Sequence, residues 1–164
     1  MDTDRIEKTV LLKAPLERVW RAISDSREFG RWFGARFDGP FVAGTSVRGV
    51  IAPTTVDDEG AKSQQPYAGV EQTWEIVAVE PKRRFAYRWH PYAVGPGVDY
   101  SAEPTTLVEF TLDETADGVW LRIIESGFDA IPAERRKAAL EANSAGWAAQ
   151  ADLVAKYLAL GERV

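Results

Sequence analysis

The spacing of hydrophobic residues in the first part of the chain predicts a strand followed by two helices. An apolar run at 9–12 favours a strand within residues 4–13. Proline at 15 suits the first turn of a helix. Apolar residues then recur at 16, 19, 20 and 23, the spacing of an amphipathic helix. A second short helix is expected over 28–33, weakened by a glycine at 30.

The middle of the chain follows a strand pattern instead. Phe85, Tyr87 and Trp89 alternate with Arg84, Ala86 and Arg88, which places the aromatic side chains on one face of a strand. Two stretches rich in glycine, proline and acidic residues interrupt the pattern and are expected to be long loops, 52–68 and 91–104. The predicted strands cover 36–37, 46–51, 70–79, 84–90, 107–112 and 119–126.

The C-terminal part predicts one long helix over 133–160, which begins after Pro132 and stops at Gly161. Its apolar stripe, which should face the sheet, contains Leu140, Trp147, Ala151, Val154 and Leu158. Strands in succession with helices at both ends imply an antiparallel sheet covered on one face, an α+β fold. Neither a linker nor a repeat divides the sequence, so residues 1–164 are interpreted as a single domain.

Composition narrows the classes of function. The chain is 45% hydrophobic and 27% charged, which is enough for a packed core. It has no cysteine, which excludes disulfide scaffolds, thiol catalysis and zinc–thiolate sites. A net charge of −5 argues against nucleic acid as the main partner. No apolar run reaches the roughly 18 residues of a membrane span, and the charged start lacks the apolar region of a signal peptide. We therefore expect a cytoplasmic protein.

Candidate metal ligands are scarce. With one histidine and no cysteine, only carboxylates remain, and these suit hard cations. The acidic segment 57–60 does not have the spacing of a calcium-binding loop and is interpreted as a solvated turn. We expect no metal site and no cofactor.

The order of elements resembles the helix-grip, START-like (SRPBCC) superfamily, in which a curved antiparallel sheet of about six or seven strands wraps a long C-terminal helix. Local motifs resemble the bacterial family of activator of heat-shock-protein-90 ATPase homologues. They are Ala14-Pro15 with Val19-Trp20, Arg31-Trp32-Phe33, the strand–proline–strand segment 80–89, and Glu125-Ser126-Gly127-Phe128-Asp129 followed by Gly146-Trp147. The resemblance covers residues 5–160. It implies a cavity between sheet and helix that holds lipids, hormones or polyketides in some relatives, and its name implies a co-chaperone role in the stress response.

Six tryptophans are the most unusual feature of the composition. Large aromatic side chains can line an apolar ligand pocket, or they can simply fill a core between sheet and helix. Asn143 and Ser144 lie one turn before Trp147 and can either bind the polar end of a ligand or satisfy the helix backbone. The residues predicted to bind a ligand are Trp32, Phe33, Trp74, Tyr87, Trp89, Phe110, Asn143, Trp147 and Ala151.

Two residues are candidates for acid–base chemistry. Glu125 follows Val119, Leu121 and Ile123 at two-residue steps, so it lies at the edge of a cavity if that face points inward. Burial would then raise its pKa; the alternatives are an ion pair with a nearby arginine or exposure at the strand end. His90 is the only histidine, and it either acts as a base or lies at a surface rim beside Pro91.

Three functional hypotheses remain open at this point. The first is a binding module for a small apolar or amphipathic molecule. The second is a co-chaperone-like domain that binds another protein, and the third is an enzyme of the cyclase or hydrolase type. The loop 91–104 carries Tyr92 and Tyr100, amphipathic residues that suit a lid over the cavity near Trp89, whereas 52–68 is interpreted as a surface loop.

Overall fold

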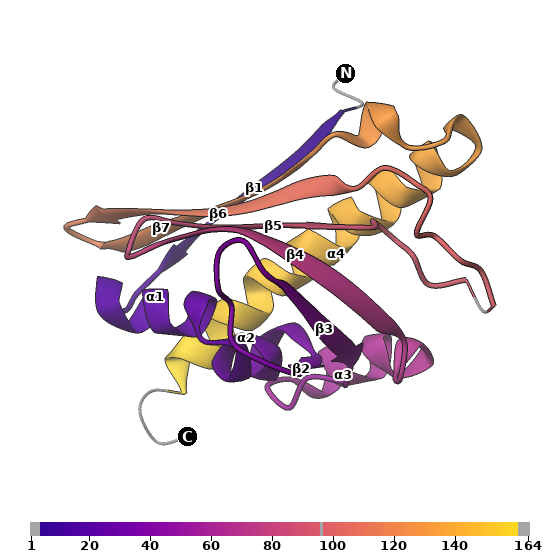
Figure 1. Ribbon diagram of the computed structural model, residues 1–164. Helices are drawn as coiled ribbons and strands as arrows, with labels where there is room; N and C mark the ends of the chain where they lie inside the picture. The colour runs from indigo at the N-terminus through magenta and orange to yellow at the C-terminus, as the bar shows by residue number, and fades with distance from the viewer. Residues whose placement is uncertain (1–3, 96, 161–164) are drawn as a thin grey trace.

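A curved antiparallel sheet that wraps around a long helix organises the structure (Figure 1). The computed structural model describes residues 4–95 and 97–160. The strand order is β1-β7-β6-β5-β4-β3-β2, and all neighbours are antiparallel. The strands are β1 (Arg5–Leu12), β2 (Ala35–Phe37), β3 (Ser46–Ile51), β4 (Glu71–Glu80), β5 (Arg84–Trp89), β6 (Thr106–Thr115) and β7 (Gly118–Ser126). The predicted α+β, helix-grip fold is confirmed, with seven strands.

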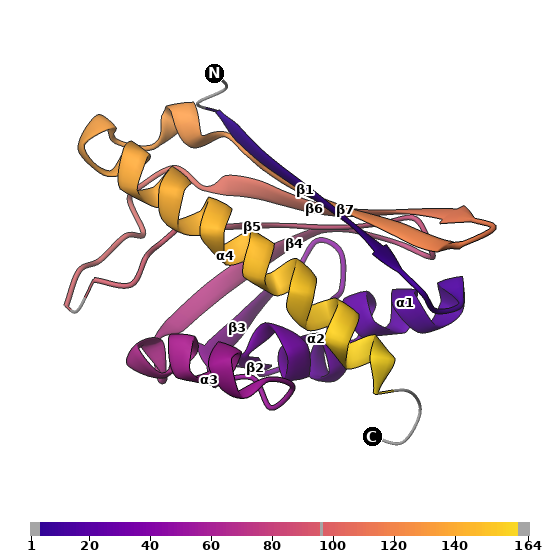
Figure 2. The same ribbon diagram turned by 180° about the vertical axis from the view of Figure 1, so that it is seen from behind.

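The helix α4 (Ala133–Ala159) runs diagonally across the inner face of the sheet (Figure 2). Trp147, Ala151, Val154 and Leu158 are buried, and Leu140 packs against the core from a half-buried position. The prediction that this stripe faces the sheet is therefore confirmed. Gly146 does not interrupt the helix. Among the described residues, no helix has the length and apolar character needed to cross a membrane.

Two short helices, α1 (Leu16–Ser24) and α2 (Ser26–Phe33), follow β1 as predicted and lie on the same side of the sheet as α4 (Figure 2). The Asp25 side chain caps α2 by accepting hydrogen bonds from the backbone N–H groups of residues 27 and 28. Gly34 ends α2 in the left-handed conformation, with φ of 96°, where glycine is favoured. This termination leaves Phe33 at the exit of α2, beside the inner face of the sheet.

The prediction of a loop over 52–68 is wrong, because the segment contains α3 (Asp58–Gln64) and the short 3-10 helix η1 (Gln65–Tyr67). Asp57 caps α3 by accepting a hydrogen bond from Gly60 N–H at 2.8 Å. Neither helix buries a residue, so the sequence has no apolar stripe that could reveal them. Gln64 holds α3 in place, since its amide donates to Phe33 O at 2.9 Å and accepts from Thr54 N–H at 2.7 Å.

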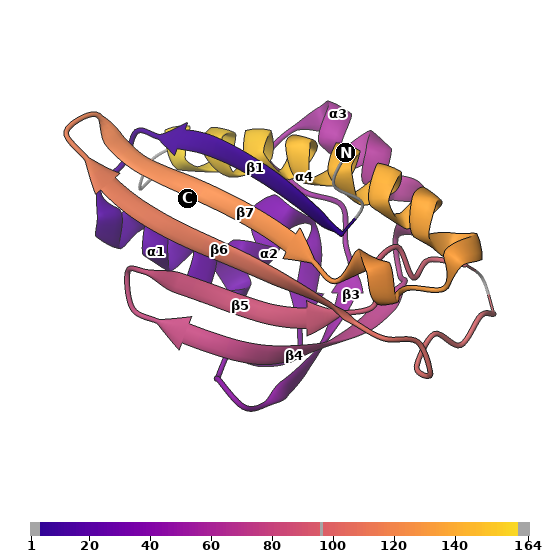
Figure 3. The same ribbon diagram turned by 90° about the horizontal axis from the view of Figure 1, so that it is seen from above.

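The segment 91–104 contains no helix or strand in its described residues, as predicted. It leaves the end of β5, projects beyond the sheet and returns to β6 (Figure 3). Arg135 of α4 holds both ends of the segment, because its guanidinium forms an ion pair with Glu103 at 2.8 Å and donates to Pro91 O at 2.9 Å. The guanidinium also lies 4.8 Å from the centre of the Tyr100 ring.

Candidate functional site

Glu125 is the most deeply buried charged residue of the sheet. It occupies the inner face of β7, in line with the buried residues Val119, Leu121 and Ile123. Its exposed fraction is 0%. The structure therefore places Glu125 inward, and no arginine within residues 4–95 and 97–160 forms an ion pair with it.

Four side chains from three elements donate hydrogen bonds to this carboxylate. Trp89 Nε1 of β5 donates to Oε2 at 2.7 Å, and Thr106 Oγ1 of β6 donates to the same oxygen at 2.5 Å. From α4, Trp147 Nε1 donates to Oε1 at 2.8 Å, and Asn143 Nδ2 donates to Oε1 at 3.0 Å. An indole N–H can only donate a hydrogen bond, and an ionised carboxylate can only accept. The two tryptophans and Glu125 are therefore matched as donors and acceptor. The carboxylate, which belongs to β7, thereby connects that strand to β5, β6 and α4.

Burial raises the pKa of Glu125 above its usual range, and the four donated hydrogen bonds limit the rise because each stabilises the ionised form. Tyr87 lies two strands away on the same inner face. Burial, together with the Glu125 charge, raises the pKa of the Tyr87 hydroxyl well above its usual value. That hydroxyl is buried and has no hydrogen-bond partner in the part of the chain that the structure describes. In both groups, burial in the low-dielectric interior is the main cause of the raised pKa.

A cavity of about 250 Å³ lies in front of the carboxylate network. Its walls come from the end of α2, from α3 and η1, from β3 to β5, from the loop 91–104 and from α4. The lining residues are Phe33, Gly34, Ile51, Gln64, Tyr67, Gln72, Trp89, Tyr92, Val94, Ala142, Asn143 and Gln150. A smaller hollow of about 80 Å³ shares Phe33, Trp89, Asn143 and Gln150 with it and also reaches Gly146 and Trp147.

Of the predicted ligand-binding residues, Phe33, Trp89, Asn143 and Trp147 line these two hollows. The others lie behind them in the core. Trp32 is fully buried and donates through Nε1 to Ala22 O at 2.9 Å. Trp74 stacks on Tyr87 with ring centroids 3.8 Å apart. Neither hollow is lined by Trp32, Trp74, Tyr87, Phe110 or Ala151.

Several lining residues were not predicted from the sequence. Gln150 lies three residues after Trp147 and seven after Asn143, so its helical face could have been recognised from the spacing alone. Tyr67 and Gln64 could not, because the helices that position them left no periodic signal. Tyr92 and Val94 line the cavity from the loop 91–104, whereas Tyr100 does not and instead accepts a hydrogen bond from Gly95 N–H at 3.0 Å. One of the two tyrosines proposed for a lid thus borders the cavity.

His90 lies at the foot of the loop 91–104, with Nε2 3.1 Å from Glu103 O. It borders neither of the two hollows near Glu125. It lines a separate hollow of about 690 Å³ between that loop and residues of β3 and β4. The structure does not bring the two acid–base candidates together.

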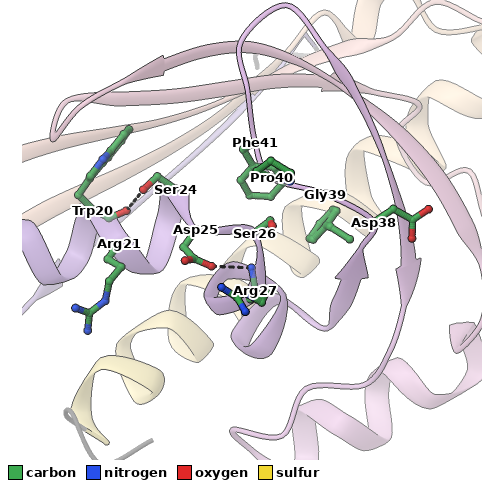
Figure 4. A pocket seen from close by; sticks show the side chains of 11 residues that line it. Trp20, Arg21, Ser24, Asp25, Ser26, Arg27, Asp38, Gly39, Pro40 and Phe41 are labelled. Atoms are coloured by element: carbon green, nitrogen blue, oxygen red, sulfur yellow. Dashed lines mark hydrogen bonds between the residues drawn. The ribbon is translucent and has the colours of Figure 1, made fainter.

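Another hollow, of about 640 Å³, lies between the first two helices and the segment before β3 (Figure 4). Its charged groups serve local structure: the Asp25 carboxylate caps α2, and Arg21 pairs with Glu28 at 2.7 Å. None of the predicted site residues lines it. Within residues 4–95 and 97–160, no group of three or more histidine, aspartate or glutamate side chains gathers in a way that could hold a metal ion.

Comparison with known proteins places the chain among similar folds. The family model described as Activator of Hsp90 ATPase homolog 1-like protein matches residues 13–159. DynU16, a protein in the dynemicin biosynthetic locus, is 26% identical with a TM-score of 0.68; the match covers 96% of this chain but only 48% of DynU16, so the chain spans about half its length.

Two further solved structures show the same fold at lower identity. Protein MLL2253 from Mesorhizobium loti is 22% identical, with a TM-score of 0.69 over 96% of this chain and 98% of that one. The Aha1 dimer from Colwellia psychrerythraea is 13% identical, with a TM-score of 0.66 over 96% and 98% of the two chains. No curated protein matches the sequence.

Proposed function

The chain belongs to the Activator of Hsp90 ATPase homolog 1-like family, and we propose that it binds a small apolar or amphipathic molecule in the cavity between the sheet and α4. The observation that carries the proposal is the hollow of about 250 Å³, with an aromatic and amide wall. An apolar cavity of about 150 Å³ can hold a benzene molecule. The volume here therefore suits a ligand of one or two rings.

The wall behind this hollow is organised before any ligand arrives. Trp89 and Asn143 line the cavity, and Glu125 fixes both through hydrogen bonds of 2.7 and 3.0 Å. A ligand therefore need not order these side chains itself, which lowers the entropy cost of binding. The burial of a charged group, which is costly without partners, is compensated by this set of donors.

An acid–base role for Glu125 has less support. The carboxylate does not line either hollow, and each of its two oxygens already accepts two hydrogen bonds. A general base must reach the proton that it removes. The geometry favours Glu125 as a group that positions the wall of a binding site.

The test is to fill the cavity from α4. Ala142 lines the cavity, whereas Ala148 is exposed on the same helix. We expect Ala142→Phe to weaken the binding of 2-naphthol and of 2-methoxynaphthalene at least tenfold, because the new ring occupies the ligand's volume. Ala148→Phe is the matched control and should bind both compounds as the original protein does. Isothermal titration calorimetry measures the affinities, and thermal unfolding verifies that both variants are folded.

Failure of the original protein to bind either compound, or equal binding by the two folded variants, would contradict the proposal.

A further inference from the structure

The segment 58–67, which forms α3 and η1, is a wall of the larger cavity that lies outside the packed core (Figure 2). Gln64 and Tyr67 line the cavity from this segment. Neither helix buries a residue, and Tyr67 is 37% exposed. A segment with so little buried apolar surface has a low free energy of local opening, because its position does not depend on core packing. The segment can therefore detach while the sheet and α4 stay folded.

One side-chain amide holds this wall against the rest of the cavity. Gln64 Nε2 donates to Phe33 O at 2.9 Å, and Gln64 Oε1 accepts from Thr54 N–H at 2.7 Å. The amide lies directly against Gly34, where a Cβ would be 2.3 Å from Oε1, so the absence of a side chain leaves room for it. Both hydrogen bonds join uncharged groups, and each therefore contributes only modestly to closure.

The two ends of the wall are fixed, which makes them suitable hinges. Before α3, Thr54 is buried and 4% exposed. After η1, Gly69 N–H donates to Ile51 O at 2.8 Å, and its φ of 89° is a conformation that glycine adopts readily. The ion pair of 3.1 Å between Asp57 and Lys156 lies at the surface and at the first of these ends, so it contributes little to closure.

The other segment at the mouth of the cavity, the loop 91–104, is held at both ends by a charged group. Arg135 forms an ion pair with Glu103 at 2.8 Å and donates to Pro91 O at 2.9 Å. Hydrogen bonds with an ionised partner are about twice as strong as those between neutral groups. The wall formed by α3 and η1, which neutral hydrogen bonds close, therefore opens at the lower cost.

Building on the proposed binding function, we propose that α3 and η1 form the gate of the cavity, which opens to admit and release the ligand, and that Gln64 is the positioning residue that closes it. The Gln64 contacts are present in the closed protein whether the cavity is empty or filled. Weakening them raises the open fraction of both states alike. The association and dissociation rates therefore rise together, and the affinity changes less than either rate.

Gln64→Met tests the gate because it removes both hydrogen bonds and keeps the length of the side chain. Phe33 O retains its second donor, Gln150 Nε2 at 2.9 Å. With 2-naphthol as the probe, stopped-flow fluorescence should show both rates rising about tenfold, the effect of one or two net hydrogen bonds. Gln65→Met, at the exposed neighbouring position, is the matched control and should leave both rates unchanged. Thermal unfolding verifies that both variants are folded.

Hydrogen exchange measured by NMR tests the gate in the empty protein. The Thr54 N–H is the most direct reporter, because its hydrogen bond is to Gln64 Oε1. In the original protein it should exchange roughly a hundredfold faster than amides at the centre of β7, and low urea concentrations should not change its rate, because local opening exposes little surface. It should exchange about tenfold faster again in Gln64→Met, whereas Gln65→Met should leave its rate unchanged.

The outcomes separate the gate from the function on which it rests. Exchange at Thr54 as slow as in β7, or unchanged rates for 2-naphthol in folded Gln64→Met, would overturn the gate and leave the binding function intact. So would a rise in the dissociation rate alone, which would make Gln64 a ligand contact. Failure of the original protein to bind 2-naphthol would instead count against the binding function, whereas fast exchange at Thr54 would still show that α3 and η1 open.

Discussion

Two groups of aromatic side chains, each drawn from the sheet and from the helices that pack on it, differ in what surrounds them. The inner cluster, defined as Phe29, Trp32, Trp74, Tyr87, Phe85 and Phe110, is buried and lines neither of the two hollows near Glu125. The mouth cluster, defined as Phe33, Trp89 and Trp147, borders two hollows and contacts a buried carboxylate. Aromatic content alone therefore does not distinguish a core from a binding site. The polar partners and the empty volume make the distinction.

The polar atoms of the two clusters show the same contrast. In the inner cluster the Trp32 indole donates to a backbone oxygen of α1, a contact that only secures packing. In the mouth cluster the indoles of Trp89 and Trp147 converge on Glu125 from a strand and a helix. A buried charge costs free energy unless fully hydrogen-bonded, so its presence here fits a wall that must hold its shape beside a cavity.

The largest expected effect comes from removing a ring in each cluster. Phe29→Ala should lower the free energy of unfolding by about 3–5 kcal/mol, because it leaves a cavity in closed packing. Phe33→Ala should cost about 1–2 kcal/mol, since Phe33 already borders empty volume and buries less area. Urea denaturation of both variants measures the difference. Equal losses would show that the mouth is packed as tightly as the inner cluster.

Removing the carboxylate comes next. Glu125→Ala should lower the free energy of unfolding by about 3 kcal/mol, because it leaves buried donors unpaired on Trp89, Trp147 and Thr106. The loss should be accompanied by weaker ligand binding, because the wall of the cavity is no longer held. Denaturation and calorimetry on the same preparation measure the two effects. A variant as stable as the original protein would mean that the network contributes nothing to the fold.

Two glycines probe the same contrast from the backbone. A Cβ at Gly30 would lie 2.2 Å from Ala35 O, whereas nothing lies within 4 Å of a Cβ at Gly146. Gly30→Ala should therefore destabilise by about 1–3 kcal/mol through overpacking. Gly146→Ala should stabilise by about 0.5–1 kcal/mol, because alanine is the better helix former. Thermal unfolding measures whether each substitution raises or lowers stability. A less stable Gly146→Ala variant would show that this side of α4 packs against other atoms.

The smallest expected effect is a pH dependence. The pKa of Glu125 is raised in the folded state, so the folded protein binds this proton more tightly than the unfolded chain does. The resulting stability is fully present below the usual carboxyl pKa and is lost as pH rises through the raised value. As the pH rises through this raised pKa, the original protein should lose stability relative to the Glu125→Gln variant, whose side chain does not titrate. If the difference in free energy of unfolding between the two proteins is the same at acidic and neutral pH, the pKa of Glu125 is not raised.

The fold was largely predictable from the sequence because most elements bury one face. The period of two along β7 and the stripe on α4 both report such burial. The helix α3 was missed because it buries none of its residues and is held instead by polar contacts of Asp57 and Gln64. Where a segment is fixed by side-chain amides and caps, hydrophobic periodicity carries no information about it.

The candidate site was predictable only in part. Two-residue spacing along β7 identified Glu125 as a residue that could point inward, but its partners come from β5, β6 and α4. Which donors meet one carboxylate depends on strand register and on where α4 crosses the sheet, and neither can be obtained from local pattern. Trp32 and Trp89 were both predicted to bind a ligand, yet Trp32 donates to a backbone oxygen and Trp89 donates to Glu125.

The most direct test of a ligand site at the mouth cluster uses the indole N–H signals in a proton–nitrogen correlation spectrum. Saturating 2-naphthol should shift the signals of Trp89 and Trp147, which border the hollows and bind Glu125. Those of Trp32 and Trp74, which line neither hollow, should stay in place. Shifts confined to Trp32 and Trp74, or no shift at any tryptophan, would contradict the account.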